Sequence, residues 1–210
     1  REAGLRRLLP EEYQHPWQIE VFLSNNGSSF FQQLTTCFSE IASQLGYRRL
    51  KLHKTLVAEA QPEQLAQSIV ARSSTRDGII VFAHDSPPVY RALALCRSRN
   101  VPVITIVTDL PDADRLCHVG IDQYQAGRTA GLLMSKTLNQ PGDILMVSGR
   151  FDYRAHRQRI AGFREAMEQR APQRYLREVL SGQDQRETIR SELARNLRSS
   201  QAIAGVYNTG

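Results

Sequence analysis

Short apolar runs that alternate with amphipathic segments constrain this chain more than any other feature. Val101 to Val107 reads VPVITIV and Asp143 to Val147 reads DILMV, so neither run alternates between apolar and polar residues. Between such runs lie segments like Arg154 to Arg170, whose apolar residues recur every three or four positions, as in a helix. Strands that are apolar on both faces are typical of parallel sheets covered by helices. The sequence therefore predicts an α/β fold.

The alternation predicts element positions along most of the chain. The predicted strands are 17–23, 50–57, 77–83, 101–107, 118–121, 143–147, 175–180 and 202–207. The predicted helices are 30–45, 62–71, 87–99, 123–138, 154–170 and 184–199. Residues 1–16 are polar, contain two prolines and are interpreted as a linker or tail.

Composition excludes several classes of protein. No run approaches about 18 consecutive apolar residues, so we expect no membrane-spanning helix and no membrane partner. The net charge of +6 comes from 27 basic and 21 acidic residues that are scattered, which gives no nucleic-acid patch. Cys37, Cys96 and Cys117 are far apart in apolar stretches, so we expect small buried residues without disulfides. This cysteine usage favours a cytoplasmic location.

The sequence lacks the usual catalytic signatures. It has no glycine-rich dinucleotide or phosphate loop, no G-x-S-x-G turn, and no metal-ligand spacing among its five histidines. We therefore predict no enzyme activity, no catalytic residues, no cofactor and no metal.

Polar and aromatic residues near strand ends are the candidate site, because parallel α/β sheets bind ligands at the carboxyl ends of their strands. Asp109 can accept hydrogen bonds from sugar hydroxyls or form a turn, and Arg159 can grip a ligand or form a surface ion pair. Asn208 can bind a ligand or sit in an ordinary turn. Of Phe30 and Phe31, one is expected in the core, and the other either joins it there or faces a sugar.

Four segments, in this order along the chain, carry a family resemblance. They are Asp77 to Val81 (DGIIV), Val101 to Met134 with its A-G-R-x-A pattern, Arg159 to Met167 (RIAGFREAM), and Gly205 to Asn208 (GVYN). Together they resemble the ligand-binding core of the lactose-repressor family, which is related to periplasmic sugar-binding proteins of type I. The resemblance covers residues 17–210.

The resemblance implies ligand roles for particular residues. Arg159 and Asn208 match ligand-binding positions of the family's second lobe, Asp109 matches an acidic residue after the fourth strand, and Phe30 and Phe31 match an aromatic pair. Two positions depart from the family pattern. Ser28 stands where the family pattern N-P-F-F has asparagine. Gln123 stands where the family's frequent D-N pair has asparagine. These departures indicate a non-standard sugar or a derivative.

The resemblance also implies two Rossmann-like lobes with parallel sheets flanked by helices. The first would span 17–121 and the second, apparently truncated, 122–210. The predicted function is the effector-binding core of a cytoplasmic transcriptional regulator. It would be a homodimer that binds a sugar between its lobes and contacts operator DNA through an N-terminal helix-turn-helix absent from this chain. The alternative is a periplasmic sugar-binding protein of a transporter.

Overall fold

A computed structural model describes residues 16–45, 49–59, 61–182, 185–198 and 202–210. Nearly all of the predicted linker or tail, residues 1–15, lies outside the described residues. The chain divides into two compact units, Arg1–Val119 and Gly120–Gly210, and each is described by itself below. The lobe boundary expected from the sequence, after Ile121, lies close to this division.

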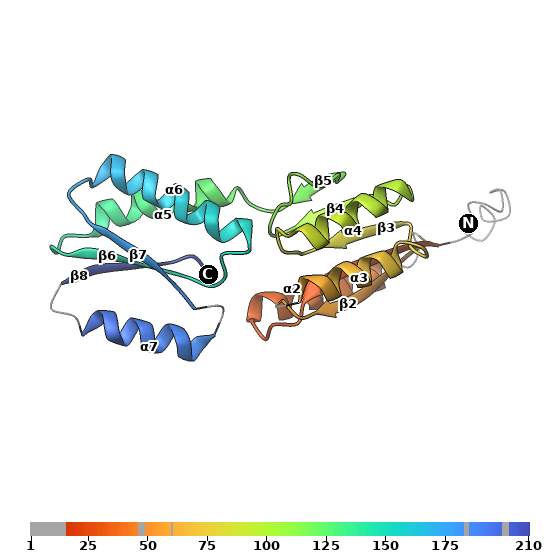
Figure 1. The fold of residues 1–210 in the computed structure, drawn as a ribbon, viewed down its shortest axis with the longest axis horizontal. Helices are drawn as coiled ribbons and strands as arrows, with labels where there is room; N and C mark the ends of the chain where they lie inside the picture. Colours follow the sequence, from red (N-terminus) through yellow and green to blue (C-terminus); the bar gives the residue numbers. More distant parts are fainter. Residues whose placement is uncertain (1–15, 46–48, 60, 183–184, 199–201) are drawn as a thin grey trace. The chain divides into compact units, whose positions relative to one another are not determined.

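The first unit contains a five-stranded parallel sheet in the order β2-β1-β3-β4-β5. Its elements are β1 (Trp17–Ser24), α2 (Ser29–Leu45), β2 (Leu50–Val57), α3 (Pro62–Arg72), β3 (Gly78–Val81), α4 (Pro87–Ser98), β4 (Val103–Ile106) and β5 (Cys117–Val119). Because all five strands run in one direction, their carboxyl ends meet at one edge of the sheet (Figure 1).

Helices cover the two faces of this sheet. Val81 packs with Leu65 of α3 and Leu93 of α4 in one buried cluster. The next residue, Phe82, contacts Phe31 of α2 with ring centroids 4.7 Å apart. Consecutive residues of an extended chain point to opposite faces, so α2 lies across the sheet from α3 and α4.

Helix α2 is the least buried helix of the first unit. Phe31 is its only buried residue, and Cys37 in its middle is exposed. Cys117, on the edge strand β5, is exposed too, whereas Cys96 of α4 is buried. The prediction that all three cysteines are buried was therefore wrong for two of them. Cys37 and Cys117 have apolar neighbours in the sequence, but the faces on which they lie are exposed.

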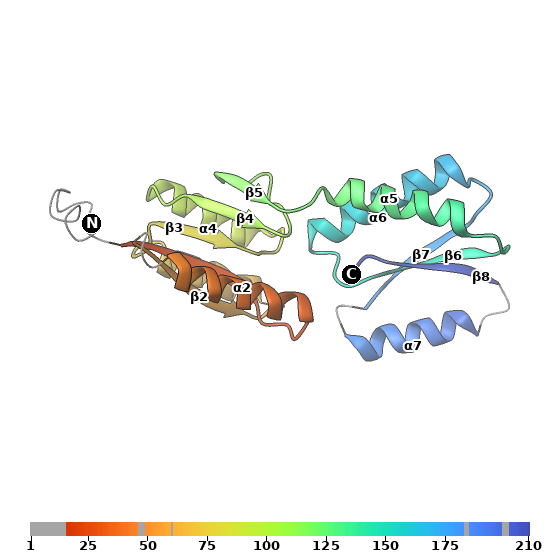
Figure 2. The same cartoon turned by 180° about the vertical axis from the view of Figure 1, so that it is seen from behind.

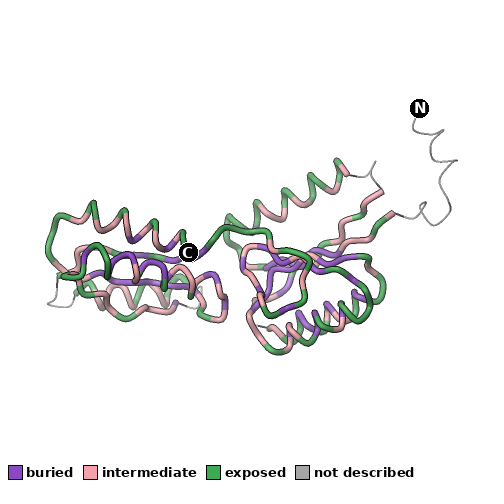
Figure 3. Tube along the Cα trace, turned by 90° about the horizontal axis from the view of Figure 1, so that it is seen from above, coloured by how far each residue is buried: buried purple, intermediate pink, exposed green. Residues whose placement is uncertain are grey.

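The second unit contains a three-stranded parallel sheet in the order β7-β6-β8. Its elements are α5 (Gln123–Thr137), β6 (Asp143–Ser148), α6 (Arg154–Arg170), β7 (Leu176–Ser181), α7 (Arg186–Leu197) and β8 (Ile203–Asn208). Helices α5 and α6 lie on one face and α7 on the other (Figures 1 and 2). Buried residues are concentrated in the strands and on the inner helix faces (Figure 3).

Glycines allow α5 and α6 to pack in close contact. A Cβ atom on Gly162 of α6 would lie 2.0 Å from the backbone oxygen of Tyr124, and one on Gly127 of α5 would lie 2.1 Å from the backbone oxygen of Arg159. A larger residue at either position would force the helix backbones apart. This packing holds the start of α6 against α5.

The α/β fold with helix-flanked parallel sheets confirms the predicted fold class, and the main differences are at strand ends. The strand predicted over 101–107 is shorter in the structure, where β4 spans Val103–Ile106. Val107 has a φ of 67°, which turns the chain out of the strand. Within the described residues, no helix is both long and apolar enough to cross a bilayer.

Candidate functional site

The start of α2 brings three predicted site residues to the carboxyl edge of the first sheet. The backbone N–H of Phe31 donates to Ser28 Oγ over 3.4 Å, so Ser28 caps the helix. Phe31 is 8% exposed and belongs to the core, whereas Phe30 is 50% exposed. Their rings meet edge to face with centroids 5.2 Å apart. The geometry leaves the ring of Phe30 accessible, and its role as a sugar contact stays a prediction.

A neighbouring polar cluster was not predicted from the sequence. Ser24 Oγ at the end of β1 donates to Glu59 Oε1, and Asn26 Nδ2 donates to the same oxygen over 2.5 Å. Glu59 follows β2, whose carboxyl end adjoins that of β1 in the sheet. The pairing fixes the loop between β1 and α2 and uses one Glu59 oxygen.

Asp109 lies beyond β4 in a network of donors. Arg115 Nε and Nη2 donate to its two carboxylate oxygens, each over 2.7 Å. Thr105 Oγ1 and the Leu110 N–H donate to Oδ1 over 3.0 and 2.8 Å. Burial alone would raise the pKa of Asp109, but the hydrogen bonds from Arg115 and Thr105, with the charges of His118 and Arg115, outweigh it and lower that pKa. Asp109 thus stabilises the turn through the Leu110 N–H and forms an ion pair with Arg115. A carboxylate oxygen can accept more than one hydrogen bond, so Oδ2 can still accept a ligand hydroxyl.

Val107 carries backbone strain beside Asp109. It is β-branched, and its φ of 67° lies in the left-handed region that such residues rarely adopt. The Thr108 N–H donates to the Ile106 carbonyl over 2.7 Å across this tight turn. Strain of this kind costs about 1–3 kcal/mol and is concentrated at functional sites. It directs Thr108 and Asp109 along the carboxyl edge.

In the second unit, Arg159 is held by neutral groups. Its Nε donates to Gln123 Oε1 over 2.7 Å, and its Nη1 donates to the Thr209 carbonyl. Gln123 begins α5, one turn before the close contact of Gly127 with the Arg159 backbone. Burial lowers the pKa of Arg159. The surface ion pair considered from the sequence is absent among the described residues.

Asn208, the last residue of β8, is exposed and directly precedes Thr209, whose carbonyl accepts from Arg159. Its Oδ1 accepts from the Gly210 N–H over 3.3 Å, which leaves the amide Nδ2 accessible. Arg159 therefore binds the chain segment that begins with Asn208 at the carboxyl end of β8, and a shared ligand for the two side chains stays a prediction. Asp109, Phe30 and Phe31 belong to the other unit, so the predicted convergence of both groups on one ligand stays a prediction.

A buried hydroxyl chain supports this edge. Thr209 Oγ1 donates to Ser148 Oγ over 2.9 Å, and His156 Nδ1 lies 2.9 Å from Thr209 Oγ1. Burial and the charge of Arg159 lower the pKa of His156 to about 4, and Asp152 only partly opposes this. His156 is therefore neutral at physiological pH. It positions Thr209, whose carbonyl binds Arg159.

Sequence reasoning did not single out these supporting residues. Ser148 ends β6, His156 lies in the first turn of α6 and Thr209 follows β8, so their position near strand ends was a usable signal. The end of β2 with Glu59 was overlooked. Gln123 was visible as a departure from the family pattern, but its bond to Arg159 was not. Among the described residues, no group of three His, Cys, Asp or Glu side chains is arranged to hold a metal ion.

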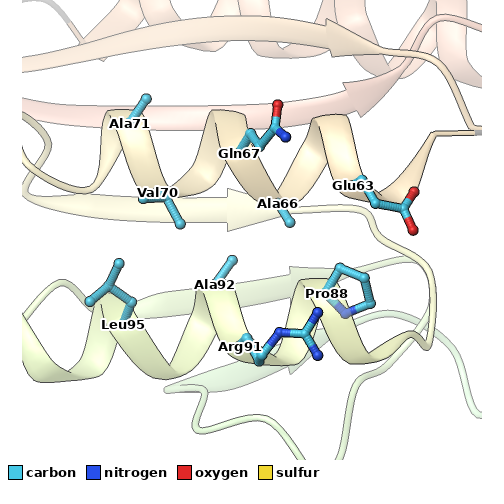
Figure 4. A pocket seen from close by; sticks show the side chains of 9 residues that line it. All are labelled: Glu63, Ala66, Gln67, Val70, Ala71, Pro88, Arg91, Ala92 and Leu95. Atoms are coloured by element: carbon cyan, nitrogen blue, oxygen red, sulfur yellow. The ribbon is translucent and has the colours of Figure 1, made fainter.

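The structure also contains a groove of about 650 Å³ between α3 and α4 (Figure 4). It is lined by Glu63, Ala66, Gln67, Val70, Ala71, Pro88, Arg91, Ala92 and Leu95. The groove runs between two helices rather than at strand ends, and apolar side chains form most of its wall. It lacks the convergent polar groups that orient a sugar.

The family profile described as a periplasmic binding protein domain matches residues 19–210. Ribose import binding protein RbsB of Haemophilus influenzae is 23% identical over 153 residues, 71% of this chain and 50% of that protein. Its Escherichia coli counterpart is 23% identical over 152 residues, 71% of this chain and 49% of that protein. The chain spans about half the length of these curated relatives.

Two solved structures show the same fold. A solute-binding protein of an ABC transporter from Burkholderia graminis, in complex with D-arabinose, has a TM-score of 0.85 at 21% identity over 93% of this chain and 66% of that one. GanP, a glucose-galactose binding protein from Geobacillus stearothermophilus, has a TM-score of 0.80 at 18% identity over 92% of this chain and 68% of that one. The names of these proteins describe binding proteins and not enzymes.

Proposed function

The chain belongs to the periplasmic binding protein domain family, and from that premise we propose that it binds a small sugar as part of a transport system. The observation that carries the proposal is the half-buried guanidinium of Arg159, which donates to the Thr209 carbonyl just after the end of β8. Arg159 retains Nη2, which has no hydrogen-bond partner among the described residues. Such a donor can bind a ligand oxygen.

Each candidate residue has a distinct role in this proposal. Arg159 donates to sugar oxygens, and Asn208 offers a donor and an acceptor to neighbouring hydroxyls. In the first unit, Phe30 offers its accessible ring to the apolar face of a sugar, and Asp109 accepts a hydroxyl at Oδ2. Ser28 acts indirectly, because it caps the helix that carries Phe30.

The relatives favour transport over the regulator reading that the sequence alone suggested. The named relatives are transport-associated sugar-binding proteins, so a membrane transporter is the proposed partner. Operator DNA, homodimer formation and a cytoplasmic location remain predictions of the regulator reading. The N-terminal region of the full-length gene product distinguishes the two, since a helix-turn-helix supports regulation and a cleavable signal supports transport.

Isothermal titration of the whole 210-residue chain with D-ribose, D-arabinose and D-galactose tests sugar binding. We expect saturable binding of at least one sugar and a loss of roughly tenfold or more in affinity for Arg159→Ala. Arg164→Ala is the matched control, because Arg164 is an exposed arginine of the same helix. Equal losses in both variants, or binding unchanged in Arg159→Ala, would remove Arg159 from the site.

A further inference from the structure

His156 and Arg159 lie close together at the start of α6 and reach the same chain segment. They are three positions apart, so their side chains extend from one face of the helix. His156 Nδ1 lies 2.9 Å from Thr209 Oγ1, and Arg159 Nη1 donates to the Thr209 carbonyl. A Cβ atom on Gly210 would lie 3.0 Å from Arg159 Nη1 and 3.9 Å from His156 Cε1. The two side chains therefore flank the segment that follows β8.

The hydroxyl chain behind His156 determines which of its ring nitrogens carries the proton. A threonine hydroxyl has one hydrogen, and Thr209 donates that hydrogen to Ser148 Oγ over 2.9 Å. Thr209 Oγ1 can then only accept a hydrogen bond from His156, so Nδ1 is the N–H donor of the ring. In a neutral imidazole the other nitrogen is an acceptor. Nε2 of His156 is therefore an unprotonated acceptor.

The surroundings of the ring keep it neutral and orient it. Burial, which is the largest cause, and the charge of Arg159 lower the pKa of His156 to about 4, while the carboxylate of Asp152 only partly opposes them. Ser148 and Thr209, on the Nδ1 side of the ring, are buried, whereas His156 itself is only half-buried. The two ring nitrogens point in different directions, so Nε2 is turned away from the buried hydroxyls.

We propose that His156 is a second ligand-binding residue at this edge, whose Nε2 accepts a hydrogen bond from a sugar hydroxyl while Arg159 donates to a sugar oxygen. The inference rests on the proposed function, because it adds a contact for the same ligand. Each sugar hydroxyl can both donate and accept a hydrogen bond. An acceptor and a donor that are three positions apart on one helix face can therefore bind neighbouring hydroxyls of one neutral sugar. Because Nδ1 is already held by Thr209, the ring loses little further rotational freedom when the sugar binds.

Two amide variants separate the roles of the two ring nitrogens. The side-chain amide of asparagine reaches the place of Nδ1, and that of glutamine reaches the place of Nε2. His156→Asn can therefore keep the contact with Thr209 and lose the ligand contact, whereas His156→Gln can do the reverse. Calorimetric titration of the whole 210-residue chain with D-ribose, D-arabinose and D-galactose measures the affinities. For the sugar that binds most tightly, we expect His156→Asn to lose roughly fivefold or more in affinity and His156→Gln to lose less.

His53→Asn is the matched control for the loss of a histidine ring. His53 is a half-buried residue of β2 in the first unit, where its Nε2 lies 2.7 Å from Gln18 Oε1. We expect this replacement to leave the sugar affinity unchanged. Circular dichroism and thermal unfolding of each variant show whether it is folded.

A measurement on the unaltered chain tests the ring nitrogens directly. With the histidine ring nitrogens isotopically labelled, nuclear magnetic resonance near neutral pH should show His156 with a protonated Nδ1 and an unprotonated Nε2. The spectrum of His156→Asn assigns these resonances by their disappearance. We expect the Nε2 resonance to shift when the tightest of the three sugars is added. If His156→Asn does not fold, His156→Gln supplies the assignment, and the resonance decides the question alone.

The outcomes separate the two proposals. A folded His156→Asn with the affinity of wild type would overturn the inference, since the ring would then act only on Thr209. A larger loss in His156→Gln than in His156→Asn would overturn it for the same reason. A protonated Nε2, or an Nε2 resonance that bound sugar does not move, would also overturn it. All of these results leave the proposed function standing. Failure of all three sugars to bind the wild-type chain would contradict the proposed function, and the inference with it.

Discussion

At the carboxyl edge of the first sheet, Asp109 accepts two bonds from Arg115. At the corresponding edge of the second sheet, the partners of Arg159 among the described residues are neutral groups. Both edges arise from the same strand-helix alternation. The difference lies in the loop residues that follow the strands. The strand order and direction therefore determine where a site can lie. The hydrogen bonds and ion pairs within each loop determine which polar atoms remain available to a ligand.

The two units also differ in how their backbones turn and pack. In the second unit, the positive φ values belong to Gly142 and Gly210, which adopt them without strain. In the first unit, Val107 adopts a positive φ without being glycine. Helices α5 and α6 meet through glycines, while α3 and α4 leave a groove between them. The stability of the second unit therefore depends more strongly on the close backbone contact between its helices α5 and α6.

The largest expected effect breaks that backbone contact. In Gly162→Ala, the added Cβ would lie 2.0 Å from the Tyr124 backbone oxygen, which has no rotamer by which to move away. We expect a loss of about 3 kcal/mol or more in the free energy of unfolding of the second unit. Urea unfolding, followed by amide exchange in β6, measures it. Gly27→Ala, where nothing lies within 4 Å of the new Cβ, is the control and should change stability little.

A pH dependence should come next in size. His156 has a folded-state pKa of about 4 against an ordinary value of 6.5. Above about pH 6.5, His156 is neutral in both the folded and the unfolded state, so its ionisation does not change the free energy of unfolding. Between about pH 6.5 and pH 4, the unfolded chain binds a proton at His156 and the folded chain does not, so stability falls as the pH falls. The second unit should lose up to about 3 kcal/mol across this window. Unfolding free energies of wild type and His156→Gln, measured at both ends of the window, test this. Parallel pH curves would refute the neutral buried histidine.

Asp109 should act in a lower pH window and with a smaller effect. Its folded-state pKa is lowered, so its contribution is present above the unfolded value of about 3.9 and is lost as pH falls through the folded value. Asp109→Asn should destabilise the first unit by about 1 kcal/mol near neutral pH, because the site is partly exposed. The difference from wild type should vanish in acid. A difference that persists well below the folded pKa would mean that the ion pair is not its source.

The smallest effect should be a gain in stability. Val107→Gly relieves a left-handed backbone at the cost of added freedom in the unfolded chain, so we expect a net stabilisation of about 0.5 kcal/mol. Val103→Gly, in the ordered part of β4, should destabilise and is the matched control. A stabilising Val103→Gly, or a destabilising Val107→Gly, would show that strain does not distinguish Val107.

Much of the fold could be predicted from the sequence because apolar periodicity is a local signal. The runs around Ile79 and Leu145 gave strand positions, and helical spacing gave α6 with the bounds that the structure shows, Arg154–Arg170. The exposure of Cys37 could not be predicted, since it depends on what covers α2 in space.

The site was only partly predictable for the same reason. Arg159 and Asn208 follow from strand-end position and family pattern. The contacts of Arg159 with Gln123 and Thr209 join residues 36 and 50 positions away, which no local pattern reports. The pairing of Asp109 with Arg115 spans six positions and could have been considered, but its two-pronged geometry required coordinates.

The central proposal is that a sugar binds at the carboxyl edge of the second sheet, where Arg159 holds it. Hydrogen–deuterium exchange of the whole chain, with and without the tightest ligand among D-ribose, D-arabinose and D-galactose, tests it most directly. We predict slower exchange in the first turns of α6, around His156 and Arg159, and at the end of β8, with α3 and α4 unchanged. Protection confined to the groove between α3 and α4, with none in α6 or at the end of β8, would contradict the account.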